Sequence, residues 1–177
     1  MSGWLRVALY RMGEQRVKEA DFAINIAEHT TRTFGLEHIL GRFADASYAY
    51  RFGAPGHDVI AVSLHVSPGD IPFAQSFRFP AGRMTERMPI SDLGLTGETK
   101  VHADEAIEVH LSSRRFAWGV RVAVPGFRPD DAYFGIEPGI TRRILLTPIR
   151  TGNTPANVTV TAMNAEGRFP VAIGRCP

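Results

Sequence analysis

The chain has 177 residues, a length that fits one large domain or two small ones. A hydrophobic fraction of 44% is enough for a packed core and argues against intrinsic disorder. The formal net charge is only +2, and the basic residues are spread in ones and twos without a basic run. The sequence therefore predicts no nucleic-acid partner.

The sequence lacks export and anchoring signals. No apolar stretch approaches the roughly 20 residues that span a bilayer, so no membrane partner is expected. The first residues lack the apolar core of a signal peptide. The single cysteine, Cys176, cannot form an internal disulfide. Together these features predict a cytoplasmic location.

Alternating apolar residues, the pattern of β-strands, dominate the first half of the chain. Leu5, Val7 and Leu9 share one face of a predicted strand over residues 4–11. A different spacing occurs over residues 34–43, where apolar residues recur as on one or two turns of a helix. Further strands are predicted over residues 21–28, 47–53, 57–66 and 72–79.

The second half repeats this strand-rich style. Seven or so strands in about 85 residues is a count typical of an immunoglobulin-like sandwich. Trp118 is expected on the apolar face of its strand with Val120 and Val122, as the buried tryptophan of such a core. The clearest strand patterns cover residues 106–113, 115–124, 140–149 and 156–163.

A stretch with little apolar periodicity separates the two halves. It contains Pro80, Gly82, Pro89 and Gly94, which favour turns and loops. We therefore predict an all-β fold made of two tandem immunoglobulin-like β-sandwich domains. The first domain would cover residues 1–84 and the second residues 91–177, with a linker over residues 85–90.

The motifs of common active sites are missing from the sequence. The six histidines form no HxH or HExxH pair, so no metal site and no cofactor is predicted. His65 and His110 alternate with apolar residues and are expected to face solvent. Neither a G-x-S-x-G nucleophile motif nor a phosphate-binding glycine loop is present. No catalytic residue is predicted.

Two adjacent aspartates, Asp130 and Asp131, lie in the segment VPGFRPDDAYFGIEPG. Neighbouring side chains on an extended chain point in opposite directions, so the two carboxylates are not expected to face one substrate. The positions that follow lack the oxygen ligands that a calcium loop needs. Aspartate favours turns, and we interpret the segment as a corner between strands that Asp131 holds. Metal binding stays an alternative.

The segment FRPDDAYFGIEPGITRRILLTP resembles the C-terminal immunoglobulin-like β-sandwich region of beta-mannosidase-like proteins, in glycoside hydrolase family 2. That region carries a pattern like D-N-Y-F-x-L-x-P-G, in which Ala132 here replaces the usual Asn. Residues 40–64 and 114–127 are also similar to strands of these proteins. The residues that match the pattern are Asp131, Tyr133, Phe134, Pro138 and Gly139.

The resemblance implies a role without catalysis. In the family the catalytic acid and the nucleophile are two glutamates on a central (β/α)8 barrel. Such a barrel needs about 250 residues and repeated strand–helix units, which this chain does not offer. The resemblance thus implies an accessory region of a larger hydrolase, packed on a catalytic barrel and acting near mannose-containing oligosaccharides. The chain alone is not expected to be an enzyme.

Two other functions stay open. A carbohydrate-binding module would stack sugars on exposed aromatic side chains. A protein-interaction sandwich unrelated to hydrolases would use the same fold for a different partner. The aromatic candidates for sugar stacking are Trp4, Tyr48, Tyr50, Trp118 and Tyr133.

Overall fold

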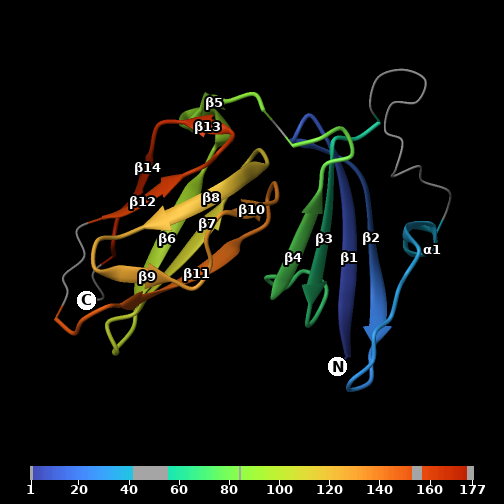
Figure 1. Ribbon diagram of the computed structural model, residues 1–177, viewed down its shortest axis with the longest axis horizontal. Coiled ribbons are helices and arrows are strands. Elements are labelled where there is room, and N and C mark those ends of the chain that lie inside the picture. Colours follow the sequence, from blue (N-terminus) through green and yellow to red (C-terminus); the bar gives the residue numbers. More distant parts are fainter. Residues whose placement is uncertain (1, 42–55, 84, 153–156, 175–177) are drawn as a thin grey trace. The chain divides into compact units, whose positions relative to one another are not determined.

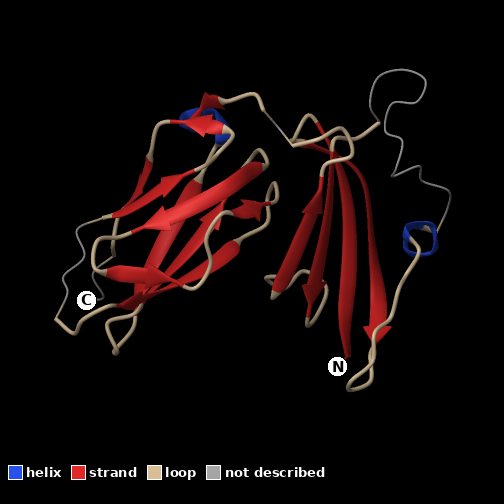
Figure 2. Ribbon diagram, in the orientation of Figure 1, coloured by secondary structure: helices blue, strands red, loops and turns tan. Residues whose placement is uncertain are grey.

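The computed structural model describes residues 2–41, 56–83, 85–152 and 157–174, and it is built almost entirely of β-strands (Figures 1 and 2). The all-β prediction is confirmed. The chain divides into two compact units, Met1–Arg83 and Met84–Pro177. Among the described residues, no helix is long and apolar enough to cross a membrane.

The described part of the first unit forms one antiparallel sheet with the strand order β2-β1-β3-β4. The short helix α1 (Leu36–Leu40) lies at the predicted helical turns. Its buried residues Ile39 and Leu40 belong to one apolar cluster with Val7 and Leu9 of the sheet. The strands are β1 (Ser2–Arg11), β2 (Gln15–Asn25), β3 (Val59–His65) and β4 (Ala74–Arg78).

Strand β3 corrects one prediction about histidine. His65 is only 2% exposed, so the expectation that it faces solvent is wrong. The face of β3 that carries Ser63 and His65 is buried, and these two polar residues bond to each other. The Ser63 hydroxyl lies 2.7 Å from His65 Nε2, while His65 Nδ1 lies 2.7 Å from the carbonyl oxygen of Asp70. His65 therefore ties β3 to the loop that follows it.

The second unit contains two four-stranded sheets, with the orders β6-β7-β11-β9 and β10-β8-β12-β14 (Figure 1). Their facing side chains alternate with outward ones and form a single apolar core. The strands of the first sheet are β6 (Thr96–Val101), β7 (Ile107–Ser112), β11 (Arg142–Pro148) and β9 (Phe127–Pro129). Those of the second are β10 (Phe134–Ile136), β8 (Ala117–Ala123), β12 (Val158–Thr161) and β14 (Phe169–Val171).

The beginning of the second unit is bonded to residues near its end. Strand β5 (Met88–Pro89) pairs in parallel with β13 (Ala165–Glu166), and a short 3-10 helix, η1 (Ile90–Leu93), follows. The Met88 N–H donates to the Asn164 carbonyl oxygen at 3.2 Å. The Arg87 guanidinium donates to the Ala165 carbonyl oxygen at 2.8 Å. These contacts lie inside the range we expected to be a linker.

Trp118 is only partly buried, which differs from the expectation that it fills the core. Strand β8 contains a β-bulge, because Phe134 pairs with Val120 whereas Ile136 pairs with Ala117. Gly119 sits in the bulge with φ +58°. The extra residue shifts the inward positions to Ala117 and Val120, so the Trp118 side chain leaves the core face. The alternation read from the sequence breaks at this glycine.

The bulge generates a prediction about two aromatic residues. Phe116 is fully buried, so Phe116→Ala should reduce the free energy of unfolding by about 3–5 kcal/mol. Trp118→Ala should reduce the free energy of unfolding by roughly half as much, because the Trp118 side chain is only partly buried. Urea denaturation of the two variants measures the difference. A larger loss for Trp118→Ala would contradict the placement of the bulge.

Gly97 of β6 allows the strand to approach β14 closely. A Cβ atom at this position would lie 2.6 Å from Val171 Cγ2 and 3.0 Å from Leu111 Cδ2. Gly97→Ala should therefore overpack the core and destabilise the second unit by about 1–3 kcal/mol. Gly174→Ala is the matched control, since its Cβ would stay 3.7 Å from the Thr99 carbonyl oxygen. Thermal unfolding of both variants tests the contact, which equal melting temperatures would contradict.

Candidate functional site

Asp131 anchors the corner that precedes β10. Its Oδ1 accepts the N–H of Ala132 at 2.8 Å, and its Oδ2 lies 2.6 Å from Arg142 Nη2. The Arg142 guanidinium carbon lies 5.5 Å from the centre of the Phe134 ring, within the range of a cation–π contact. Asp131 thus connects the loop before β10 to the first residue of β11, in the other sheet.

Asp130 serves a different partner. Its Oδ1 accepts the N–H of Leu145 at 3.0 Å, and its own N–H donates to the Leu145 carbonyl oxygen at 2.9 Å. Each of the two adjacent carboxylates therefore holds a different part of β11, and they do not form a catalytic pair. No group of three histidine, cysteine, aspartate or glutamate side chains could hold a metal ion within the described ranges.

Tyr133 and Phe134 take opposite positions after this corner. Phe134 is buried in the core, whereas the Tyr133 side chain is 62% exposed. Tyr133 also has φ +60°, a left-handed conformation that costs a non-glycine residue about 1–2 kcal/mol. The hydrogen bonds and the ion pair of Asp131 hold the chain in this conformation. The corner therefore presents an aromatic ring to solvent.

The turn at Pro138 and Gly139 fixes where β11 begins. Gly139 has φ +73°, and its N–H donates to the Ser113 carbonyl oxygen at 2.9 Å. The Ile140 N–H closes the turn by donating to the carbonyl oxygen of Glu137, a fully buried residue, at 3.1 Å. The turn is thus tied to the end of β7, beside Ser112.

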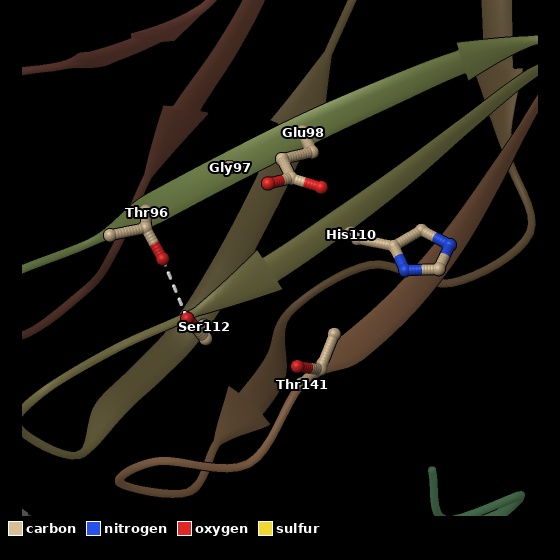
Figure 3. Close-up of a pocket in the computed structure, with 6 residues that line it drawn as sticks. All are labelled: Thr96, Gly97, Glu98, His110, Ser112 and Thr141. Atoms are coloured by element: carbon tan, nitrogen blue, oxygen red, sulfur yellow. Dashed lines mark hydrogen bonds between the residues drawn. The ribbon is translucent and has the colours of Figure 1, made fainter.

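A polar hollow lies on the outer face of the first sheet of the second unit (Figure 3). Its volume is about 260 Å³. Glu98 and His110 are paired across β6 and β7, and so are Thr96 and Ser112. The hydroxyls of Thr96 and Ser112 are 2.6 Å apart. The lining residues are Thr96, Gly97, Glu98, His110, Ser112 and Thr141.

Glu108 gathers the basic side chains beside this hollow. Its carboxylate lies 2.5 Å from His110 Nε2, 3.2 Å from His102 Nε2 and 3.6 Å from Arg143 Nη1. The hydrogen bond with His110 is the main cause that lowers the pKa of Glu108 below its ordinary value. Burial opposes this effect, while Arg143 and His102 add to it. Glu108 is therefore ionised and well compensated at neutral pH.

Glu98 has no such compensation. It is exposed, and within the described part of the chain its side chain makes no hydrogen bond and no ion pair. Lys100, the next outward residue of β6, stands opposite Glu108 rather than opposite Glu98. The Glu108 carboxylate is thus paired with basic groups, whereas the Glu98 carboxylate has no hydrogen-bond or ion-pair partner among the described residues.

Sequence reasoning missed most of this hollow. Only His110 was considered, as a solvent-facing residue, and the structure leaves it partly exposed. Strand β6 was not predicted, because its inward positions are Gly97, Thr99 and Val101 and give little apolar alternation. The polar residues at every second position of β6 and β7 were the available signal.

The aromatic candidates for sugar stacking do not form one platform in the described structure. Tyr133 is exposed, but Trp4 and Trp118 are partly buried and lie in different units. Tyr48 and Tyr50 lie outside the described residues, as does Cys176. The hollow on the β6–β7 face contains no aromatic ring besides the imidazole of His110.

The fold is similar to part of a known enzyme. No family model and no curated protein matches the chain. Solved structures of the exo-chitosanase CsxA from Amycolatopsis orientalis do match. One of these structures aligns with a TM-score of 0.55 and 15% sequence identity. The alignment covers 97% of the present chain but only 24% of the exo-chitosanase chain. A complex of CsxA with PNP-beta-D-glucosamine aligns at a TM-score of 0.54, with the same identity and coverage.

At this identity the match shows the fold alone. The chain spans about a quarter of the length of the exo-chitosanase, at 24%. The likeness supports the predicted β-sandwich fold, and it does not support a beta-mannosidase in particular.

The setting of Glu108 generates a prediction about pH. Because its pKa is lower in the folded chain than the ordinary value of 4.5, its carboxylate stabilises the fold at higher pH. This stabilisation is lost as the pH falls through the folded-state pKa. Glu108→Gln should therefore be less stable than the parent chain by about 1 kcal/mol at neutral pH, with a smaller gap in acid.

Urea denaturation from neutral to acid pH measures the difference in stability between Glu108→Gln and the parent chain. Glu166→Gln is the control, because the Glu166 side chain is 70% exposed and lies 3.9 Å from its nearest cation, Arg87. Its stability should follow that of the parent chain at each pH. A gap for Glu108→Gln that stays constant or widens in acid would refute the electrostatic role.

Proposed function

We propose that this chain is a non-catalytic accessory β-sandwich region of a larger glycoside hydrolase, which packs on a catalytic barrel outside these 177 residues. The observation that carries the proposal is the unequal coverage of the fold match. Nearly the whole chain, 97%, corresponds to only 24% of an enzyme that acts on a polysaccharide. A region of that size supports a catalytic domain rather than replacing it.

The chemistry of the corner agrees with this proposal. The adjacent carboxylates of Asp130 and Asp131 accept hydrogen bonds from backbone N–H groups and from Arg142. The residues that resemble the family 2 pattern thus build a fold element. The exposed Tyr133 ring beside them is our candidate for a contact with the barrel, because a strained and exposed aromatic residue favours a role in binding.

The sugar on which the parent enzyme acts is part of the proposal. The sequence resemblance favours a β-mannoside, whereas the fold match is to an enzyme described as an exo-beta-D-glucosaminidase. Both are β-linked hexosides, and we propose that the parent cleaves a substrate of this class. The β-glucosaminide is the first to test, because the fold match rests on the whole chain.

The chain alone should not hydrolyse these sugars. We expect purified chain to release no nitrophenol from nitrophenyl β-mannoside or nitrophenyl β-glucosaminide above the rate in buffer. The physical reason is that hydrolysis needs two carboxyl groups held across one glycosidic bond. Robust turnover that survives repurification would overturn the accessory role.

The reading frame around the coding sequence provides a second measurement. A frame that also encodes about 250 residues of repeated strand–helix units would support the proposal. A frame that encodes this chain alone would contradict it.

A further inference from the structure

The polar hollow on the β6–β7 face has the features of a binding site that the accessory role does not require. Hydroxyls of Thr96, Ser112 and Thr141 line it, together with the Glu98 carboxylate and the His110 imidazole (Figure 3). A flat solvated sheet face would offer similar residue types without a hollow. Its volume of about 260 Å³ lies just below the roughly 300–1,000 Å³ of sites for drug-sized ligands. A ligand of one small ring fits this size.

The charge of the hollow determines which charge its ligand should carry. Glu108 is compensated by His102, His110 and Arg143. Glu98 keeps an uncompensated negative charge among the described residues. A ligand that carries an ammonium group would place a positive charge and several N–H donors against this carboxylate. Neutral ligands would leave it solvated and gain less.

The neighbouring groups select a ligand rich in hydroxyls. The Thr96–Ser112 pair stands two residues along the strands from the Glu98–His110 pair, a separation of about 7 Å. His110 uses Nε2 for Glu108, so Nδ1 is left for a ligand within the described surroundings. Both ends of the hollow can thus exchange hydrogen bonds with hydroxyls around one six-membered ring.

We propose that this hollow binds a single amino-sugar unit, with its ammonium group against Glu98 and its ring hydroxyls against Thr96, Ser112 and His110. The amine and the hydroxyls follow from the charge and the lining of the hollow. The choice of β-D-glucosamine as the particular sugar rests on the proposed function. Such a site would hold the parent enzyme near a polymer of amino sugars, apart from the reaction itself.

The test is a titration of the full 177-residue chain followed by amide chemical shifts. Methyl β-D-glucosaminide is the probe, and methyl β-D-glucoside and methyl N-acetyl-β-D-glucosaminide are its neutral counterparts. We expect saturable shifts at Gly97, Glu98 and His110 with a dissociation constant in the millimolar range, about 1 mM. The two neutral sugars should bind about tenfold more weakly, because they lose the charge-assisted bond.

Two variants assign the charge to one side chain. Glu98→Gln should weaken binding of the glucosaminide about tenfold and should leave the affinity for the neutral glucoside unchanged. Glu86→Gln is the matched control, because Glu86 is exposed and lies outside the hollow. Its affinity for each sugar should equal that of the parent chain. Both substitutions are at exposed positions, so each variant should fold, and its amide spectrum shows whether it does.

Three outcomes would overturn the proposal: no saturable shifts with the glucosaminide, shifts located elsewhere on the chain, or equal affinity in Glu98→Gln. Methylammonium chloride is a further arm. If methylammonium caused shifts as large as those with the sugar and bound with the same affinity, the hollow would be a cation site only, and the proposal would also be overturned. None of these results depends on hydrolysis or on the reading frame, so the accessory role can stand or fall separately.

Discussion

The contact between Asp131 and Arg142 determines much of the second unit. Asp131 lies in the loop before β10, and Arg142 is the first residue of β11, so their ion pair joins the two sheets at one end of the sandwich. The Arg142 side chain is 18% exposed, which limits the screening of this pair by water. Its guanidinium also lies against Phe134 and so adds an apolar contact to the charged one.

The corner meets β11 at its first residue, and β11 lies between β7 and β9 in the sheet. The turn at Gly139 is tied to Ser113, and the strand then places Arg143 opposite His110. Arg143 in turn helps His102 and His110 to compensate Glu108. The segment interpreted from the sequence as a corner thus serves as scaffold, and it leads into the strand that borders the polar surface of β7.

The alternation of apolar and polar residues was enough to predict strands that have one apolar face and one solvent-exposed face. Strands β7 and β11 are of this kind: both ranges were predicted, and the apolar residues of their inward faces, such as Val109 and Ile144, are buried. The pattern failed where backbone geometry interrupts it. A bulge at Gly119 moves Trp118 off the core face, and the position of a bulge cannot be predicted from a single sequence.

It also failed where burial does not follow polarity. The polar face of β3 is buried, so Ser63 and His65 satisfy each other inside the protein instead of meeting solvent. The hollow around Glu98 could not be predicted because it depends on which residues of β6 and β7 stand opposite each other. That register is set by the fold.

The parallel pairing of β5 with β13 has a consequence for the order in which the second unit can be completed. A ribosome delivers Met88 and Pro89 long before Ala165 and Glu166, their only strand partners in the described structure. Gly97 likewise packs against Val171, which is synthesised much later. The start of this unit therefore lacks these partners until residues 165–171 have left the ribosome.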